Sequence, residues 1–111
     1  MTFVRCVAVR WGGWDPQPGI VEVRLVDVHG VAHRFIHKVP YFGSKPQLGP
    51  DTAYPVEVEL DCEILDTEFR DGLTVLSVTT ERPSDIETVD GRTEFEVSPD
   101  QLADSASGSR T

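Results

Sequence analysis

A single domain is predicted by the length of the chain, 111 residues, and by its ordinary share of charged residues, 26%. Nineteen acidic residues against ten basic ones give a formal net charge of −9, and no local run of basic residues stands out along the sequence. Because nucleic acid repels such a chain and no apolar run approaches the ~20 residues of a membrane helix, neither nucleic acid nor membrane is an expected partner.

Three strands joined by turns are predicted in the first part of the chain. Residues 2–11 carry apolar side chains on both phases, which is typical of a central strand. Residues 20–28 and 31–39 follow as the arms of a hairpin, because His29 and Gly30 form a turn in which glycine takes a positive φ angle.

The clearest strand signal lies at residues 56–64, where apolar side chains alternate with Glu57, Glu59, Asp61 and Glu63. A shift of register by one residue would bury these four carboxylates, so the alternation fixes which face points inward. Together with the second strand, it predicts a core made of Val21, Val23, Leu25, Val56, Val58, Leu60, Cys62 and Ile64.

The last part of the chain contains two Asp-Gly turns. The first leads into a strand at residues 73–80, and the second predicts a hairpin between residues 86–89 and 93–97. Residues 98–101 match a capping box with proline at the first helical position, which predicts one short helical turn near Leu102.

The predicted fold class is all-β, because strands joined by short turns pair antiparallel. We expect a small antiparallel barrel or sandwich of roughly six to seven strands in Greek-key order, with an OB-like order as one version. Residues 1–103 are predicted to form a single β-domain. Residues 104–111 are small and polar, and we expect them to form a disordered tail that can be deleted without loss of stability.

Two connections, at residues 11–19 and 40–55, are rich in aromatic residues, proline and glycine. Long loops are often functional, and aromatic rings held by prolines give rigid contact area. Antiparallel alternation places both loops at the same end of the barrel. The candidate binding residues are therefore Trp11, Trp14, Tyr41, Phe42 and Tyr54. The alternative is that these rings pack against the barrel end as a structural lid.

Neither a metal site nor a cofactor site is predicted. His33 and His37 share one face of a strand, but a spacing of four residues separates them by roughly 13 Å, too far to share one ion. The row of acidic residues from Glu57 to Glu63 is interpreted as a solvated face, paired with Arg24, Arg34 and Lys38 on neighbouring strands. An acid–base site or a calcium site on this row is the less favoured alternative.

Cys6 and Cys62 both lie in apolar segments, and we interpret them as small buried side chains rather than as a disulfide. No serine occupies a nucleophile elbow, and a thiol in a strand interior is usually inert. Arginine supplies nearly all the basic residues, as is typical of GC-rich bacterial genomes. With no recognisable signal peptide, the expected location is the bacterial cytoplasm.

Three classes of function stay open at this stage. The first is a non-enzymatic acidic protein-binding module, of an inhibitor or immunity type, that uses the aromatic loops to bind a basic protein. The second is a small-ligand-binding barrel closed by the two loops. The third is a small hydrolase-like enzyme built on the acidic strand. We favour them in that order.

Overall fold

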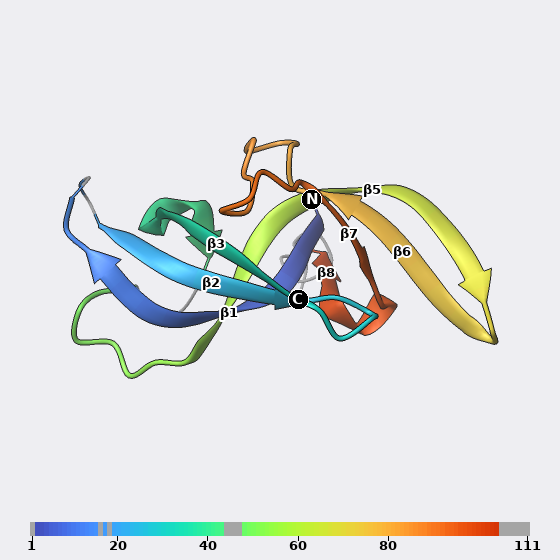
Figure 1. The fold of residues 1–111 in the computed structure, drawn as a ribbon, viewed down its shortest axis with the longest axis horizontal. Helices are drawn as coiled ribbons and strands as arrows, with labels where there is room; N and C mark the ends of the chain where they lie inside the picture. The colour runs from blue at the N-terminus through green and yellow to red at the C-terminus, as the bar shows by residue number, and fades with distance from the viewer. Residues whose placement is uncertain (1, 16, 18, 44–47, 105–111) are drawn as a thin grey trace.

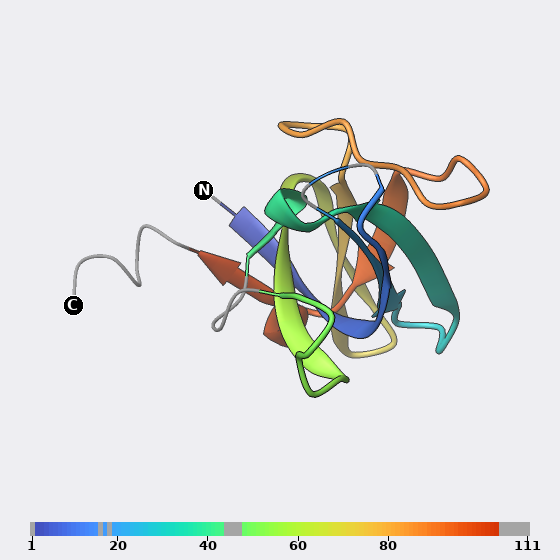
Figure 2. The ribbon, with the colours of Figure 1, turned by 90° about the vertical axis from the view of Figure 1, so that its left-hand side faces the viewer.

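One antiparallel sheet curls into a half-barrel, and the views in Figure 1 and Figure 2 show this curvature along and across the strands. The computed structural model describes residues 2–15, 17, 19–43 and 48–104. Its strands are β1 (Thr2–Gly13), β2 (Ile20–Val26), β3 (Ala32–Lys38), β4 (Phe42–Gly43), β5 (Val56–Arg70), β6 (Leu73–Thr79), β7 (Glu94–Val97) and β8 (Leu102–Asp104). Two 3₁₀ turns, η1 (Val39–Tyr41) and η2 (Pro99–Gln101), complete the described elements. The all-β prediction is confirmed, and the single curled sheet selects the barrel-like alternative over the sandwich.

The strand order β3-β2-β1-β5-β6-β7 contains the predicted Greek key. After the β1–β2–β3 meander, the chain returns to place β5 beside β1, which is the fourth-beside-first arrangement of that motif. Strand β1 is central, as its apolar phases predict: it pairs with β5 from Thr2 to Ala8 and with β2 from Val7 to Gly13. In addition, β4 pairs with β5, and β8 pairs with β1.

The core lies on the concave face of the curled sheet and follows the predicted periodicity of β2 and of the first half of β5. Seven of the eight predicted core residues are buried or pack against the buried cluster. The exception is Ile64, which is 46% exposed, so its predicted inward position is wrong. A β-bulge between Ile64 and Asp66 accompanies the departure of β5 from the barrel, and no second layer covers the strand there.

The predicted hairpin around Asp90 is wrong in one of its arms. The turn itself is present, because Gly91 has a φ of 87° and the Thr88 amide donates to Arg92 O at 2.9 Å. Residues 86–89, however, form no strand with β7. They run along the edge of β3 instead, where the Val89 amide donates to Arg34 O at 3.0 Å. This irregular segment helps to close the half-barrel between its two outer strands (Figure 2).

The C-terminal capping box is confirmed, since Ser98 and Gln101 bracket η2 as predicted. The next residues form β8, in which Leu102 packs against the core and Asp104 pairs with Thr2. The predicted tail therefore begins one residue inside a paired strand, and its remaining residues, 105–111, lie outside the described part of the chain. Within that described part, no helix is both long enough and apolar enough to cross a membrane.

Candidate functional site

The two tryptophans of the first loop stack against each other at one end of the sheet. Their ring centroids lie 5.0 Å apart in an edge-on arrangement. Trp11 is half-buried and packs against the core, whereas Trp14 is 54% exposed. Gly19 permits this packing, because a Cβ there would lie 2.1 Å from Cη2 of Trp11. Trp11 is therefore an anchor, and Trp14 is the ring that this loop offers to solvent.

The aromatic residues of the second loop are likewise divided between buried rings and an exposed ring. Phe42 is buried in the core, and the Tyr54 hydroxyl donates to Gly49 O at 2.8 Å while its ring packs against the core. Tyr41 is 44% exposed, with its ring 6.1 Å from that of His37. Figure 1 shows that the described parts of both connections lie at the end of the sheet drawn on the left. Of the five predicted binding residues, Trp14 and Tyr41 are those that present an exposed ring.

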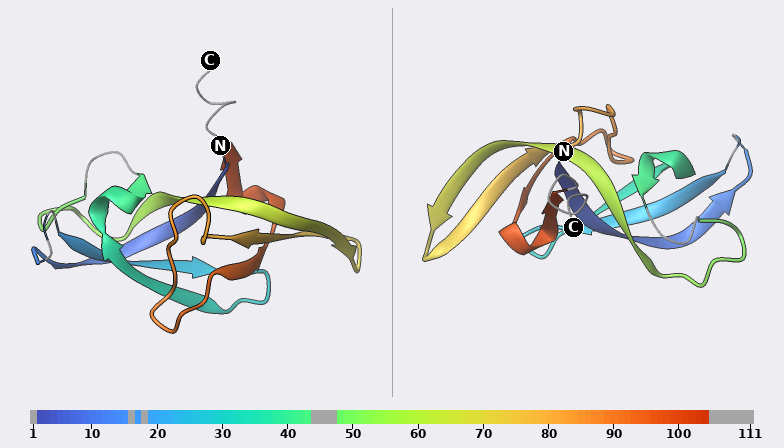
Figure 3. Two further views of the ribbon diagram at one scale, coloured as in Figure 1. Left: turned by 90° about the horizontal axis from the view of Figure 1, so that it is seen from above. Right: turned by 180° about the vertical axis from the view of Figure 1, so that it is seen from behind.

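A second surface lies at the opposite end, where the β5–β6 hairpin projects beyond the barrel (Figure 1 and Figure 3). Phe69 is 76% exposed and Leu73 is 68% exposed, on either side of the Asp71-Gly72 turn. With Ile64 and Leu65, which are also exposed, they form what we call the hairpin patch. The patch covers both faces of the hairpin, because Phe69 pairs with Thr74 whereas Leu73 pairs with Arg70. Sequence reasoning missed this patch because it continued the inward alternation through Ile64. Consecutive apolar residues at 64 and 65 were the available signal of the bulge.

Carboxylates surround the hairpin patch. Glu63, Asp66, Glu68 and Asp71 lie along the hairpin, and its one arginine, Arg70, is already engaged. Arg70 donates to both oxygens of Glu96 on β7, at 3.1 and 2.7 Å, and also to Glu68. Hydrogen bonds from Arg70 and His29 lower the pKa of Glu96 to about 2. The hairpin therefore presents apolar side chains within a negatively charged border.

A carboxylate held by three arginines lies on the outer face of the sheet. Glu22 on β2 is 2% exposed, and its Oε1 accepts a hydrogen bond from Arg10 Nε at 2.8 Å. Arg10 Nη2 forms an ion pair with the same oxygen at 2.7 Å. Glu22 Oε2 accepts from Arg34 Nε at 3.1 Å and from Arg24 Nε and Nη2 at 3.3 Å. Burial acts to raise the pKa of Glu22, but hydrogen bonds and charge attraction from these arginines outweigh it and lower the pKa.

These contacts correct the predicted pairing of the acidic row on β5. Arg24 and Arg34 bind Glu22 instead, because β1 lies between their strands and β5. The acidic row forms ion pairs at its two ends instead. Arg5 Nε lies 3.8 Å from Glu57 Oε2, and Arg82 Nε lies 3.0 Å from Glu63 Oε1.

Asp27 and His33 form a buried acid–imidazole pair at the β2–β3 turn. The ring Nε2 of His33 lies 2.8 Å from Asp27 Oδ2, and Oδ1 accepts the amides of His29 and Val31 at 2.9 and 3.0 Å. The ring of His33 also meets Phe95 edge-on at 5.0 Å. Among the described residues, no hydroxyl or thiol completes this pair as a nucleophile, so its contacts serve to hold the turn.

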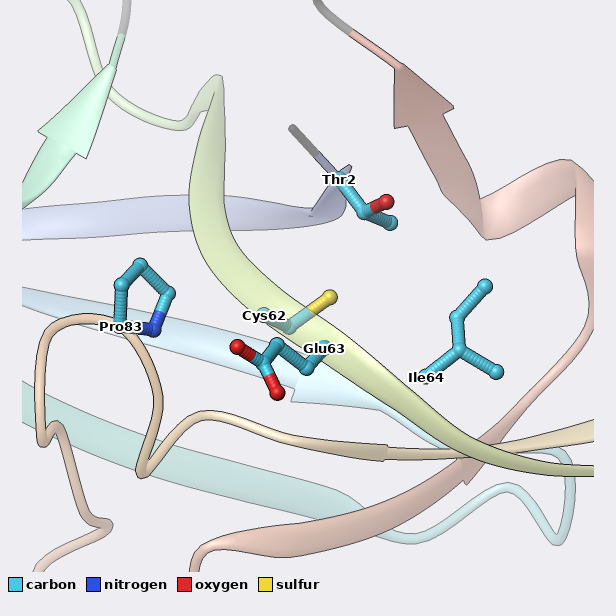
Figure 4. Close-up of a pocket in the computed structure, with 5 residues that line it drawn as sticks. All are labelled: Thr2, Cys62, Glu63, Ile64 and Pro83. Atoms are coloured by element: carbon cyan, nitrogen blue, oxygen red, sulfur yellow. The ribbon is translucent and has the colours of Figure 1, made fainter.

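Both cysteines are free and buried, as predicted. Burial, with a further contribution from Asp61, raises the pKa of Cys62 to about 12, so its thiol stays protonated. Cys62 borders a hollow of about 560 Å³ at the point where β5 leaves the barrel, and Figure 4 shows its sulfur on the side of Thr2, away from Pro83. In the part of the chain that the structure describes, no group of three His, Cys, Asp or Glu side chains is placed to hold a metal ion.

Comparison with known proteins adds no relative: no family model, no curated protein and no solved structure matches the chain. Functional inference therefore rests on the surfaces described above.

Proposed function

We propose that this protein is a non-enzymatic binding module for a basic protein partner, and that the hairpin patch is its contact surface. One observation carries the proposal: four large apolar side chains are exposed on the two faces of a projecting hairpin that also carries carboxylates. Large exposed apolar groups beside polar ones mark interaction sites in soluble proteins, because their burial by a partner is favourable by about 25 cal/mol per Å².

The negative charge of the carboxylates around the hairpin patch favours a positively charged partner. Seven carboxylates and one arginine lie between residues 57 and 71, and that arginine is engaged by Glu68 and Glu96. Lysine and arginine side chains on a partner would be steered to this end and would pair with the rim. A second copy of the chain is disfavoured, because it would bring like charges together across the contact.

The backbone of β5 supports the same proposal. Beyond Glu63, β5 pairs with β6, and within the described residues no strand lies along its other edge. An open edge of this kind can accept an extended segment as an added strand, with backbone hydrogen bonds supplying affinity and side-chain contacts supplying specificity. The partner segment expected here is extended, basic, and apolar at alternate positions.

The aromatic end remains the second candidate surface, because Trp14 and Tyr41 are both exposed there. A single experiment compares the two. The tagged protein is used to retain partners from its native cells, in parallel with a Phe69→Ser/Leu73→Ser variant, a Trp14→Ala/Tyr41→Ala variant and Val89→Ser as the matched control. Val89 is also exposed and lies outside both surfaces.

The expected result is a basic protein that is retained by the wild type, the Val89 control and the aromatic variant, and lost by the hairpin variant. Retention should fall as salt is raised, because the rim charges are exposed. Retention by the hairpin variant would contradict the proposal, and loss by the aromatic variant alone would assign contact to the other end. Unchanged melting temperatures show that the variants are folded.

A further inference from the structure

The outer face of β1, β2 and β3 carries a basic patch that is not apparent as a run of basic residues in the sequence. Arg10, Arg24, Arg34 and Lys38 are far apart along the chain, yet the register brings them onto one face. Arg24 pairs with Arg34, Ile20 pairs with Lys38, and Arg10 pairs with Glu22. Four of the ten basic residues thus share one face of the sheet with Glu22, in a protein whose net charge is −9.

The three arginines carry more positive charge and more N–H donors than the single carboxylate of Glu22 can pair with. One carboxylate neutralises one guanidinium, so the three arginines around Glu22 leave a local surplus of positive charge. Arg34 donates to Glu22 through Nε, and among the described residues no side-chain acceptor engages its two terminal amino groups. Since a guanidinium has five N–H donors in a planar fork, the cluster retains donors that suit a second oxyanion.

A groove lies beside this cluster. It has a volume of about 370 Å³, which is within the lower range of small-molecule sites. It is lined by Arg10, Trp11, Gly12, Ile20, Glu22 and Ile36. A Cβ at Gly12 would come within 3.0 Å of Ile20 Cγ1, so the absence of a side chain there leaves the groove open. Cationic donors and two isoleucines therefore border one concavity.

We propose that this groove binds a small molecule that carries an oxyanion, a carboxylate or a phosphate monoester, on a short apolar group. The oxyanion would take the spare donors of Arg10 and Arg34, and the apolar group would lie against Ile20 and Ile36. Glu22 would limit the affinity for this ligand, because its own charge neutralises one of the three guanidinium groups and occupies several of their donors.

The size of the patch favours a small ligand over a polymer. Three strands span roughly 10 Å across the sheet. A carboxylate bounds the patch on the side of β5, where Glu57 lies opposite Val7. A nucleic-acid strand that crossed the patch in this direction would soon meet this negative charge.

The test titrates the protein with phenyl phosphate, benzoate and inorganic phosphate, and follows backbone amide shifts by NMR. Phenyl phosphate and benzoate should bind saturably, with a dissociation constant of ~1 mM as expected for such small ligands, and inorganic phosphate should bind more weakly because it lacks the apolar group. Shifts should concentrate at residues of β1, β2 and β3. Arg34→Gln should weaken binding about fivefold or more. Arg82→Gln, an exposed arginine distant from the groove, is the matched control and should change nothing.

Glu22→Gln supplies the decisive comparison. If the cluster receives an anion, removal of the carboxylate raises the local positive charge and tightens phenyl phosphate binding, whereas a purely structural network predicts unchanged or weaker binding. Absence of saturable binding, or equal affinity in the wild type and Arg34→Gln, would overturn the proposal. Binding of a single-stranded oligonucleotide without binding of phenyl phosphate would overturn it as well, and would assign the patch to a nucleic-acid backbone.

Discussion

The imidazole of His33 donates to the carboxylate of Asp27 across 2.8 Å in the protein interior, and Asp27 in turn accepts two backbone amides of the β2–β3 turn. One side chain therefore links the turn to the core. Asp27→Asn should lower the free energy of unfolding by about 1–3 kcal/mol, because an amide replaces one acceptor oxygen with a donor at a buried site. Urea unfolding measures the loss, with Asp51→Asn at an exposed carboxylate as the control. Equal stability of the two variants would contradict this role.

The same pair predicts a pH dependence with a definite sign. Burial acts to raise the pKa of Asp27, but the hydrogen bonds from His33, Val31 and His29 outweigh it, and the folded pKa is lower than the ordinary value of 3.8. The stabilisation is therefore fully present above the unfolded pKa and is lost as pH falls through the folded pKa.

The stability difference between the wild type and Asp27→Asn should then be constant near neutral pH and should narrow below about pH 4. Unfolding curves at a series of pH values measure it for both proteins. A difference that persists unchanged at the lowest pH at which both proteins fold would show that the charge of Asp27 contributes nothing.

Leu60 and Ile64 test where β5 leaves the barrel. Leu60 is fully buried, so Leu60→Ala should cost about 2–5 kcal/mol. Ile64 occupies the same predicted phase but is exposed, so Ile64→Ala should cost less than about 1 kcal/mol. Denaturant unfolding of both variants gives the comparison. Similar losses at the two positions would mean that the hairpin packs on the core.

Gly19 tests the anchoring of Trp11. Gly19→Ala should destabilise the protein strongly, because the residue has a φ of 118° and the added Cβ would enter the Trp11 ring. Gly49→Ala is the matched control, since nothing lies within 4 Å of a Cβ there. The melting temperature reports the loss, and tryptophan fluorescence reports displacement of the ring. An unchanged melting temperature in Gly19→Ala would show that the ring is free to move.

Local pattern was enough to predict most of the sheet. Alternation in β2 and in the first half of β5 identified the buried face, and the Asp71-Gly72 turn has positive φ at both residues, as its sequence suggests. Prediction failed where tertiary context decides. Residues 86–89 have a strand-like composition, yet they lie along β3, and Ile64 continues an apolar alternation past the end of the barrel.

The surfaces were harder to predict than the strands. Arg10, Arg24 and Arg34 converge on Glu22 through strand pairing across residues distant in sequence, and no linear run of charges reveals that convergence. The aromatic loops were correctly placed at one end by antiparallel alternation. Which rings face solvent depends on packing against Gly19 and the core, which composition does not specify.

The pairing of Thr2 with Asp104 has a consequence for the connectivity of the chain. Since β1 begins where β8 ends, a short linker from Asp104 to Thr2 would join the two without crossing the sheet. New ends could then be opened at Gly30, in the exposed β2–β3 turn, which leaves every strand intact. In such a circular permutant, the contact between β1 and β8 changes from the most distant in sequence to a local one. The seven register pairs between β2 and β3 change in the opposite direction, from local to distant, and they outnumber the three between β1 and β8. Because loop closure opposes distant pairing, the permutant should fold more slowly than the natural order of strands while keeping the same sheet.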